Sequence, residues 1–356
     1  MRITAVGTAL LTAASALLWA TPAQAATTGV VSVVQTTKVR YKAGNGQQNQ
    51  VVITRSGNTI TVDDRVTIKA GAGCRAVKGD KTRIRCTPSK APTRVQVFAG
   101  DRNDRVENLS DLGISIDGGN GNNVLIGGPR ADLIVAYNGT NKIYGRGGAD
   151  DLRGGGGKDL IWGGAGADHI LGDDGNDVIS AGAGADYVST GVGNDRVYGG
   201  AGNDHFNMWD YREYGSDNDY LAGGSGFDLV SYVTYETSIA ADADGVTGDD
   251  GGKGERDTIA TDVESIYGGS AADRLNGTAR ADSLWGYQGD DLIYGFGGDD
   301  VLQGEGGKDR LYGGAGSDFV SGVDGGDPAA KDLIDGGAGD DYCFVQGPDT
   351  RVSCER

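Results

Sequence analysis

The sequence predicts an all-β fold in which a parallel solenoid of nine-residue repeats follows a small all-β segment. Three observations lead to this prediction. A nine-residue pattern recurs through most of the chain, its eighth position is apolar, and glycine fills the positions where the backbone must turn. The chain has 65 glycines and only 6 prolines in 356 residues. Its glycine content is therefore far above the usual share of about 7%, while the three-residue period and proline content of collagen are absent.

The repeat is unbroken over two long segments, 118–207 and 268–321. Residues 163–171 read GGAGADHIL, and the next two units read GDDGNDVIS and AGAGADYVS. The eighth position is apolar in all sixteen in-phase repeats, which a disordered glycine linker would not require. Each repeat is therefore expected to bury one side chain in a short strand of three residues, followed by a six-residue turn. Isolated units occupy 214–222, 223–231, 327–335 and 336–344.

The sixth position of the repeat carries the chemistry. It is Asp in fourteen of the sixteen in-phase repeats, and the exceptions are Asn123 and Asn141. Two strands and two turns make an 18-residue coil, so each repeat is expected to lie on the second repeat after it, with Asp168 between Asp150 and Asp186. Carboxylates stacked about 5 Å apart repel one another strongly unless cations lie between them. With turn carbonyls they form all-oxygen cages, which suit Ca²⁺ better than Mg²⁺ or a soft metal.

These units resemble the RTX, or haemolysin-type calcium-binding, nonapeptide GGxGxDxUx. The resemblance implies a parallel β-roll, also described as a β-helix solenoid, with Ca²⁺ held between successive turns by the sixth-position Asp and turn carbonyls. Arg130, Ala271 and Arg280 replace the fourth-position glycine, so their repeats, and the two Asn repeats, are expected to bind weakly or not at all. The predicted calcium ligands are Asp150, Asp159, Asp168, Asp177, Asp186, Asp195, Asp204, Asp291, Asp300, Asp309 and Asp318.

The N-terminal 25 residues are expected to be a secretory signal peptide. Arg2 precedes an apolar run from 3 to 20, and Ala23-Gln24-Ala25 forms a small-x-small cleavage pattern. An uncleaved anchor is the alternative. Outside this segment no membrane span is predicted. A cleavable signal also departs from the many RTX proteins that leave through a C-terminal signal, and the chain resembles small secreted members of actinobacterial type. We expect an extracellular protein.

The four cysteines also fit an exported chain. An even number of cysteines predicts two disulfides, and three connectivities are possible. The local pairs are favoured because the two groups lie far apart in an elongated molecule; a metal site is the alternative, although no CxxC motif or nearby His supports it. These residues are Cys74, Cys86, Cys343 and Cys354.

Charge divides the mature chain into two parts. Residues 26–97 contain 13 Lys and Arg against 3 Asp and Glu, whereas residues 98–356 contain 18 against 47. The basic part is either a separate all-β head or the first irregular coils of the solenoid. Its charge suits adhesion to an anionic cell-wall polymer, or it is merely a solvated surface. The predicted organisation is a signal peptide at 1–25, the head or cap at 26–97, a first repeat block at 98–231, an insert at 232–267, and a second block with a disulfide-stapled cap at 268–356.

Strands in the head are expected near 30–34, 51–54, 59–62, 65–68, 83–86 and 94–98, with a hairpin turn at Ser56-Gly57-Asn58. In the insert, Asp249, Asp250 and Asp257 could bind a further ion, or they belong to a solvated acidic loop.

The sequence singles out no catalytic set. It lacks a GxSxG elbow, an HExxH motif and a phosphate-binding GxxxxGK[ST] loop, and His169 and His205 are expected to be fillers on a sheet face. The net charge of −18 disfavours nucleic acid. A non-enzymatic, calcium-dependent structural or surface-interaction protein is predicted. One alternative is a polysaccharide-modifying β-helix protein. The other is a polysaccharide-binding protein that uses the ninth-position aromatics Tyr144, Trp162, Tyr198, Tyr267, Trp285, Tyr294 and Tyr312.

Overall fold

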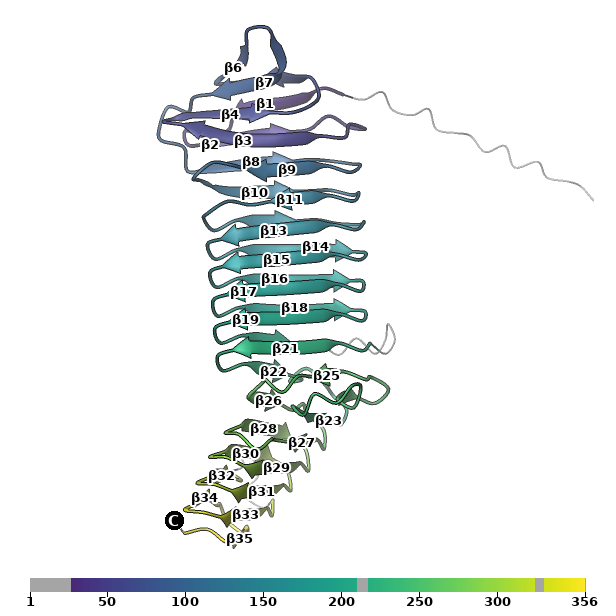
Figure 1. Ribbon diagram of the computed structural model, residues 1–356, viewed down its shortest axis with the longest axis vertical. Helices are drawn as coiled ribbons and strands as arrows, with labels where there is room; N and C mark the ends of the chain where they lie inside the picture. Colours follow the sequence, from purple (N-terminus) through teal and green to yellow (C-terminus); the bar gives the residue numbers. More distant parts are fainter. Residues whose placement is uncertain (1–26, 210–216, 324–329, 356) are drawn as a thin grey trace, which may run out of the picture.

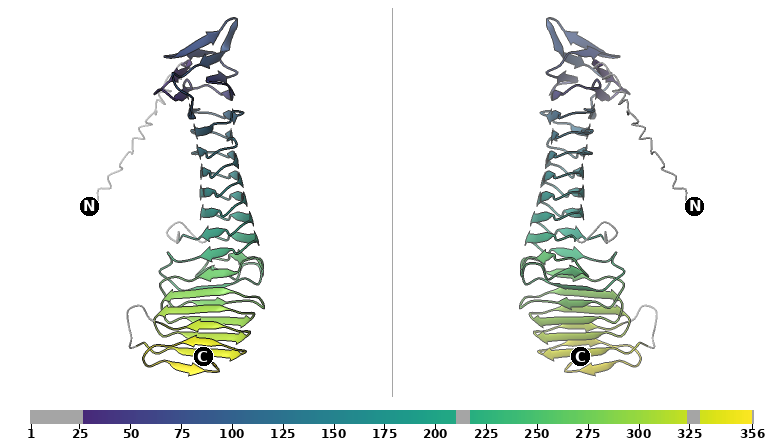
Figure 2. Two further views of the ribbon diagram at one scale, coloured as in Figure 1. Left: turned by 90° about the vertical axis from the view of Figure 1, so that its left-hand side faces the viewer. Right: turned by 90° about the vertical axis from the view of Figure 1, so that its right-hand side faces the viewer.

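The computed structural model describes residues 27–209, 217–323 and 330–355. These residues form an elongated stack of short strands, with the N-terminal strands at one end and the C-terminus at the other (Figures 1 and 2). The predicted signal peptide lies outside the described residues, as do parts of two isolated repeats. The strands belong to three sheets, and the all-β solenoid prediction is confirmed.

The first sheet runs the length of the described chain and has 16 strands. In spatial order these are β34 (Tyr342–Phe344), β32 (Phe319–Ser321), β30 (Val301–Gly306), β28 (Ser283–Gln288), β26 (Ser265–Tyr267), β22 (Leu229–Ser231), β20 (His205–Asn207), β18 (Tyr187–Val192), β16 (His169–Asp174), β14 (Asp151–Gly156), β12 (Leu133–Val135), β10 (Gly113–Asp117), β8 (Arg94–Phe98), β2 (Lys38–Lys42), β1 (Gly29–Val33) and β5 (Ile68–Ala70).

The opposite side of the solenoid is divided between two sheets. The second sheet contains β25 (Thr258–Ile259), β21 (Tyr220–Ser225), β19 (Arg196–Ala201), β17 (Val178–Ala183), β15 (Leu160–Ala165), β13 (Lys142–Gly147), β11 (Val124–Ile126), β9 (Arg105–Asn108), β3 (Gln50–Ser56), β4 (Thr59–Asp63), β7 (Asp80–Cys86) and β6 (Cys74–Val77). The third contains β24 (Gly251–Gly252), β23 (Ile239–Asp242), β27 (Arg274–Asn276), β29 (Leu292–Gly297), β31 (Arg310–Ala315), β33 (Leu333–Ala338) and β35 (Thr350–Val352).

Each repeat pairs in parallel with the second repeat after it, as predicted. Ile170 of β16 pairs with Val188 of β18, and Ile161 of β15 pairs with Ile179 of β17. Many strands have six residues rather than the predicted three, because the ladder continues into the next repeat; Asp173 pairs with Gly191, for example. The first three positions of a repeat therefore extend the strand as well as beginning the turn.

The core is a column of single apolar side chains from each repeat. All sixteen eighth-position residues are at most 1% exposed. Residues from the two facing sheets, such as Leu152 and Ile161, belong to one continuous cluster that extends into the N-terminal strands. This narrow core gives each coil little apolar burial of its own, so the coil depends on its neighbours above and below.

The N-terminal basic segment continues both sheets. Strand β2 pairs in parallel with β8, and β3 pairs in parallel with β9. The predicted hairpin is present, with Gly57 at φ 56° between β3 and β4. The strand expected at 65–68 begins only at Ile68. Strands β2 and β6 were not predicted. Strand β2 buries only Val39 and Tyr41, and its Lys and Arg residues face outward.

Both cysteine pairs form the favoured local disulfides, Cys74–Cys86 and Cys343–Cys354. The first joins β6 to β7 directly across their ladder. The second ties β34, at the end of the first sheet, to the C-terminal segment after β35. The disulfides therefore lie at the two ends of the solenoid.

Fourth-position glycines allow the coils to approach closely. At Gly184 the backbone has φ 148°, and an added Cβ would lie 1.8 Å from the carbonyl oxygen of Gly166 on the preceding coil. Only glycine fits this combination of positive φ and backbone contact.

We predict that Gly184→Ala will lower the free energy of unfolding by about 3 kcal/mol or more, because the coils must separate to admit the methyl group. Gly79→Ala is the matched control, because Gly79 also has positive φ (81°) but has no atom within 4 Å of an added Cβ. The control should cost only about 1–2 kcal/mol. Thermal unfolding in millimolar calcium measures both, and an equal loss in the two variants would contradict the close-approach argument.

Candidate metal centre

Sixth-position residues stack into ladders beside the sheets. In each ladder the backbone N–H of one residue donates to the carboxylate Oδ1 of the corresponding residue on the next coil. Asp150 donates to Asp168 at 2.8 Å, and Asp159 donates to Asp177 at 2.7 Å. All seven pairs predicted from the 18-residue spacing are brought together in this way.

We name the ladders by their sheets. The ladder of the first sheet contains Asp132, Asp150, Asp168, Asp186, Asp204, Asp228 and Glu264, and then Asp282, Asp300, Asp318 and Asp341. The ladder of the second sheet contains Asn49, Asp104, Asn123, Asn141, Asp159, Asp177, Asp195, Asp219 and Asp257. The ladder of the third sheet contains Asp273, Asp291, Asp309, Asp332 and Asp349.

The second carboxylate oxygen, Oδ2, is the distinctive feature of the intact repeats, which have Gly at the fourth position and Asp at the sixth. It is buried and has no hydrogen-bond donor, and a buried acceptor left unsatisfied costs about 1–3 kcal/mol. Such regular orphaned oxygens point to a missing electrophile. Among the described residues, predicted ligands with an orphaned Oδ2 are Asp150, Asp159, Asp168, Asp177, Asp186, Asp195, Asp204, Asp291, Asp300 and Asp318.

A small cradle lies next to the orphaned oxygen in repeats whose first position is glycine. A Cβ added at Gly145 would meet Asp150 Oδ2 at 2.3 Å and the carbonyl oxygen of Gly163 at 2.5 Å. The same arrangement recurs at Gly295, with Asp300 Oδ2 at 2.3 Å and Gly313 O at 2.5 Å. The first-position glycine thus keeps open a space bordered by a carboxylate and a carbonyl from successive coils. The carboxylate and carbonyl groups would offer only hard oxygen ligands to a metal ion, so these residues fit Ca²⁺.

Burial makes the charged carboxylates costly in the absence of a cation. Desolvation raises the pKa of Asp159 and Asp177 to about 7 and the pKa of Asp195 to about 8. It raises the pKa of Asp291 to about 8, where the carboxylates of Asp309 and Asp273 add to the effect. The ladders therefore favour either protons or cations.

The repeats with a substituted fourth position differ from the intact ones. In all three, a backbone N–H of the same turn satisfies the Oδ2, so the carboxylate is complete without a cation. The contacts are Gly128 to Asp132 at 2.6 Å, Gly269 to Asp273 at 2.6 Å, and Thr278 to Asp282 at 2.5 Å. This gives a physical reason for the weak binding expected of these repeats.

Three aspartates of the ladders were missed as ligands from sequence. Asp219, Asp228 and Asp341 belong to isolated repeats, and each has the buried, orphaned Oδ2 of the intact repeats. Their partners lie 24 or 23 residues away rather than 18, which hid the pairing. Asp104 has the same orphaned oxygen but lies in no recognisable repeat.

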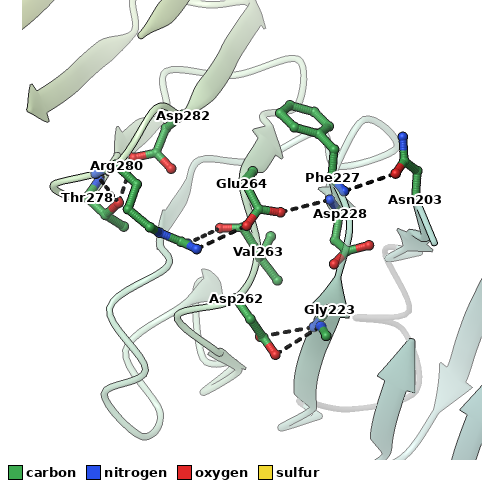
Figure 3. Close-up of polar contacts among 11 residues, drawn as sticks. Asn203, Gly223, Phe227, Asp228, Asp262, Val263, Glu264, Thr278, Arg280 and Asp282 are labelled. Carbon is green, nitrogen blue, oxygen red and sulfur yellow. Dashed lines mark hydrogen bonds and ion pairs between the residues drawn. The ribbon is translucent and has the colours of Figure 1, made fainter. Parts of the chain in front are cut away.

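The first-sheet ladder extends to Glu264 where the two repeat blocks meet (Figure 3). Asp228 N–H donates to Glu264 Oε2 at 3.0 Å, and Arg280 forms an ion pair with Glu264 Oε1 at 3.0 Å. Beside it, Asp262 accepts the backbone N–H groups of Gly223 and Gly224. The positive charge of Arg280 therefore compensates the negative charge of Glu264 in this ladder.

The expectation of a solvated acidic loop in the insert is wrong for two of its three acids. Asp257 is buried and accepts from Asp219 N–H and the Tyr232 hydroxyl. Asp250 is also buried and accepts from two backbone N–H groups. Both carboxylates accept backbone N–H groups near β21 and β25, where the second sheet ends. Asp249 is exposed and lies near Asp242 and Asp244.

A sequence profile described as the RTX calcium-binding nonapeptide repeat (4 copies) matches residues 117–152, 144–179, 171–206, 214–231, 267–295, 294–327 and 329–345. These matches cover more than half of the chain. The chain belongs to the RTX calcium-binding repeat family. Its repeats make it a calcium-binding structural protein, consistent with the orphaned oxygens of the ladders. A search of curated proteins found no match.

In the ranges that the structure describes, no helix is long and apolar enough to cross a membrane.

We predict that acid will stabilise the calcium-free RTX solenoid. The folded pKa values of about 6 to about 8 lie above the ordinary value of 3.8, so the stabilising contribution is complete below about pH 4 and is lost as pH rises through 6–8. In metal-stripped buffer, circular dichroism should show more β structure at pH 5 than at pH 8. Equal or greater β content at pH 8 would contradict the burial of these carboxylates.

Proposed function

We propose that this RTX chain is exported and folds when Ca²⁺ fills its ladders outside the cell. The observation that carries the proposal is the repeated, buried Oδ2 without a donor. The two disulfides and the N-terminal apolar segment with its cleavage pattern support export. The RTX repeats support calcium as the ion.

The electrostatics explain why folding would depend on the ion. Without calcium, each coil must bury carboxylates about 5 Å from their neighbours in return for one apolar side chain per repeat. Bound Ca²⁺ supplies a double positive charge to the oxygens of two successive coils. Extracellular sites with dissociation constants of about 10⁻⁴–10⁻³ M would fill outside the cell and stay empty inside it. The binding free energy then becomes folding free energy.

A structural or surface-interaction role follows from this architecture. The exposed sheet faces form a rigid, elongated surface, and we retain the prediction that the protein is not an enzyme. His169 and His205 flank Tyr187 at ring distances of 5.2 and 5.0 Å, an arrangement that fits side chains covering a sheet face.

A calcium titration of the mature protein tests the proposal. We predict that chelation will convert the compact, β-rich protein into an expanded chain, as measured by circular dichroism and small-angle X-ray scattering. Asp177→Asn should raise the calcium concentration at the midpoint because it removes one ladder carboxylate. Asp174→Asn changes the same charge on an exposed position of the same coil and should shift the midpoint less. A chelated protein as compact as the calcium form would refute the proposal.

A second candidate function is binding of an anionic glycan by the N-terminal segment. A hollow of about 1050 Å³ lies beside the hairpin of β6 and β7. Arg75, Lys78 and Arg85 line it together with the hydroxyls of Ser56, Thr59, Thr61 and Thr87, and no acidic residue lines it. Guanidinium groups suit carboxylate, sulfate or phosphate groups, and the hydroxyls suit sugar hydroxyls.

Strand pairing adds a second reason. Arg75 lies directly opposite Arg85 on the neighbouring antiparallel strand, next to the Cys74–Cys86 disulfide that fixes this register. Like charges in this position are destabilising without an anion between them. Within the described residues neither arginine has a carboxylate at salt-bridge distance. The hollow has no aromatic lining on which nucleic-acid bases could stack.

A stacked pair among the ninth-position aromatics offers less to a sugar. Tyr144 and Trp162 stack on each other, with centroids 4.5 Å apart and planes 2° apart. Their facing surfaces are thus covered by one another. The glycan hypothesis therefore rests on the hollow.

We predict that the calcium-loaded protein will bind hyaluronate, a carboxylate polysaccharide, and will not bind neutral dextran. Arg75→Ser with Arg85→Ser should weaken binding about tenfold or more, because two charge-assisted contacts are lost. Lys38→Ser with Lys69→Ser makes the same charge change on strands of the first sheet and should have little effect. Equal losses in the two double variants, or equal retention of DNA and hyaluronate, would contradict a glycan site in the hollow.

A further inference from the structure

Three buried asparagines occupy ladder positions in the N-terminal part of the second sheet. Asn49, Asn123 and Asn141 are each at most 2% exposed. Like the aspartates, Asn123 and Asn141 use Oδ1 to accept a backbone N–H from the preceding coil, from Asp104 and Asn123 respectively. They differ at the second side-chain atom, which is an NH₂ donor instead of an orphaned oxygen.

The amide group donates to oxygens that surround it. Asn141 Nδ2 lies 3.3 Å from Gly139 O, 3.3 Å from Gly154 O and 3.1 Å from Asp159 Oδ1. Asn123 Nδ2 lies 3.2 Å from Gly119 O and 3.0 Å from Gly121 O. Two turn carbonyls, with a carboxylate oxygen from the next coil at Asn141, are hard acceptors of the kind that a calcium ion would take.

Asn49 repeats this arrangement two coils before Asn123. Its Nδ2 lies 3.0 Å from Ala99 O and 2.9 Å from Asp104 Oδ1. Asp104 Oδ1 also accepts Asn49 N–H at 2.6 Å, so only its other oxygen is orphaned. In this part of the ladder, three of the first four positions therefore carry an amide, and an aspartate occupies only the second.

At this end of the solenoid, groups of the protein also satisfy the carboxylate oxygens of the first-sheet ladder. Asp132 uses both oxygens to accept backbone N–H groups, from Ile114 and Gly128. The guanidinium of Arg94 donates to the carbonyl oxygens of Ile114 and Ala131, at 3.3 and 2.7 Å. A positive charge of the protein therefore lies beside the first aspartate of this ladder.

We propose that protein donors take the place of calcium at the ladder positions up to Asn141, with the single orphaned oxygen of Asp104 as the exception, and that this end of the solenoid folds without the ion. Strands β12 and β13 then present a formed edge on which the calcium-dependent coils assemble. The proposal rests on the proposed calcium-dependent folding for the remainder of the chain. It also separates the RTX repeats at 118–144, whose ladder residues Asn123, Asp132 and Asn141 have no orphaned carboxylate oxygen, from the repeats with orphaned oxygens that begin with Asp150.

Hydrogen exchange of the intact mature protein in chelator tests the proposal. We expect amides of β9 and β11 to be protected and amides of β15–β21 to exchange freely, with protection throughout after calcium is added. If all strands lose protection in chelator, this proposal fails while calcium-dependent folding stands. If all strands stay protected, calcium-dependent folding itself fails.

Asn141→Asp provides the reciprocal test. The change replaces the donor by an oxygen, so it should add about one bound calcium per chain, and exchange at β11 in chelator should speed up about tenfold or more. Asn138→Asp makes the same change at an exposed position of the same turn and should do neither. Unchanged calcium stoichiometry and unchanged exchange in Asn141→Asp would overturn the proposal, and the wild-type exchange pattern decides it if the variant does not fold.

Discussion

The structure depends on one constraint, which is that a buried carboxylate oxygen needs an electrophilic partner. Each intact repeat uses Oδ1 to hold the backbone of the preceding coil and leaves Oδ2 buried without a donor. The first contact fixes the register of the solenoid, and the second makes that register costly unless a cation or proton is present. Stability and ion binding are therefore properties of the same side chain.

The apolar core is too narrow to replace this interaction. One residue per repeat, such as Ile161 or Ile170, fills the space between the sheets. Glycine at the turn positions lets the coils approach closely, but it also gives up side chains that could have enlarged the core. The places where the repeat is imperfect show what the protein can substitute for the ion: a backbone N–H at Asp132, an amide at Asn141 and an arginine at Glu264.

The period predicted most of the fold, because an apolar residue at every ninth position and the turn glycines fix strand direction and register. It also predicted which aspartates stack. It did not predict β2, whose exposed residues are basic. Nor did it predict the burial of Asp257, which accepts from Asp219 38 residues earlier, or of Asp250, which bridges Asp257 in the insert where the period is lost. The role of Asn141 was hidden for a different reason: the sequence shows that a carboxylate is missing, but only the geometry shows that an amide donates to its neighbours' oxygens.

The most direct measurement is anomalous diffraction from crystals of the mature protein grown in calcium. The account predicts calcium peaks beside the orphaned Oδ2 atoms of the ladders, and none beside Nδ2 of Asn141. The aspartates concerned are Asp150, Asp159, Asp168, Asp177, Asp186, Asp195, Asp204, Asp291, Asp300 and Asp318. A calcium-saturated crystal in which those oxygens contact only water or each other would contradict it.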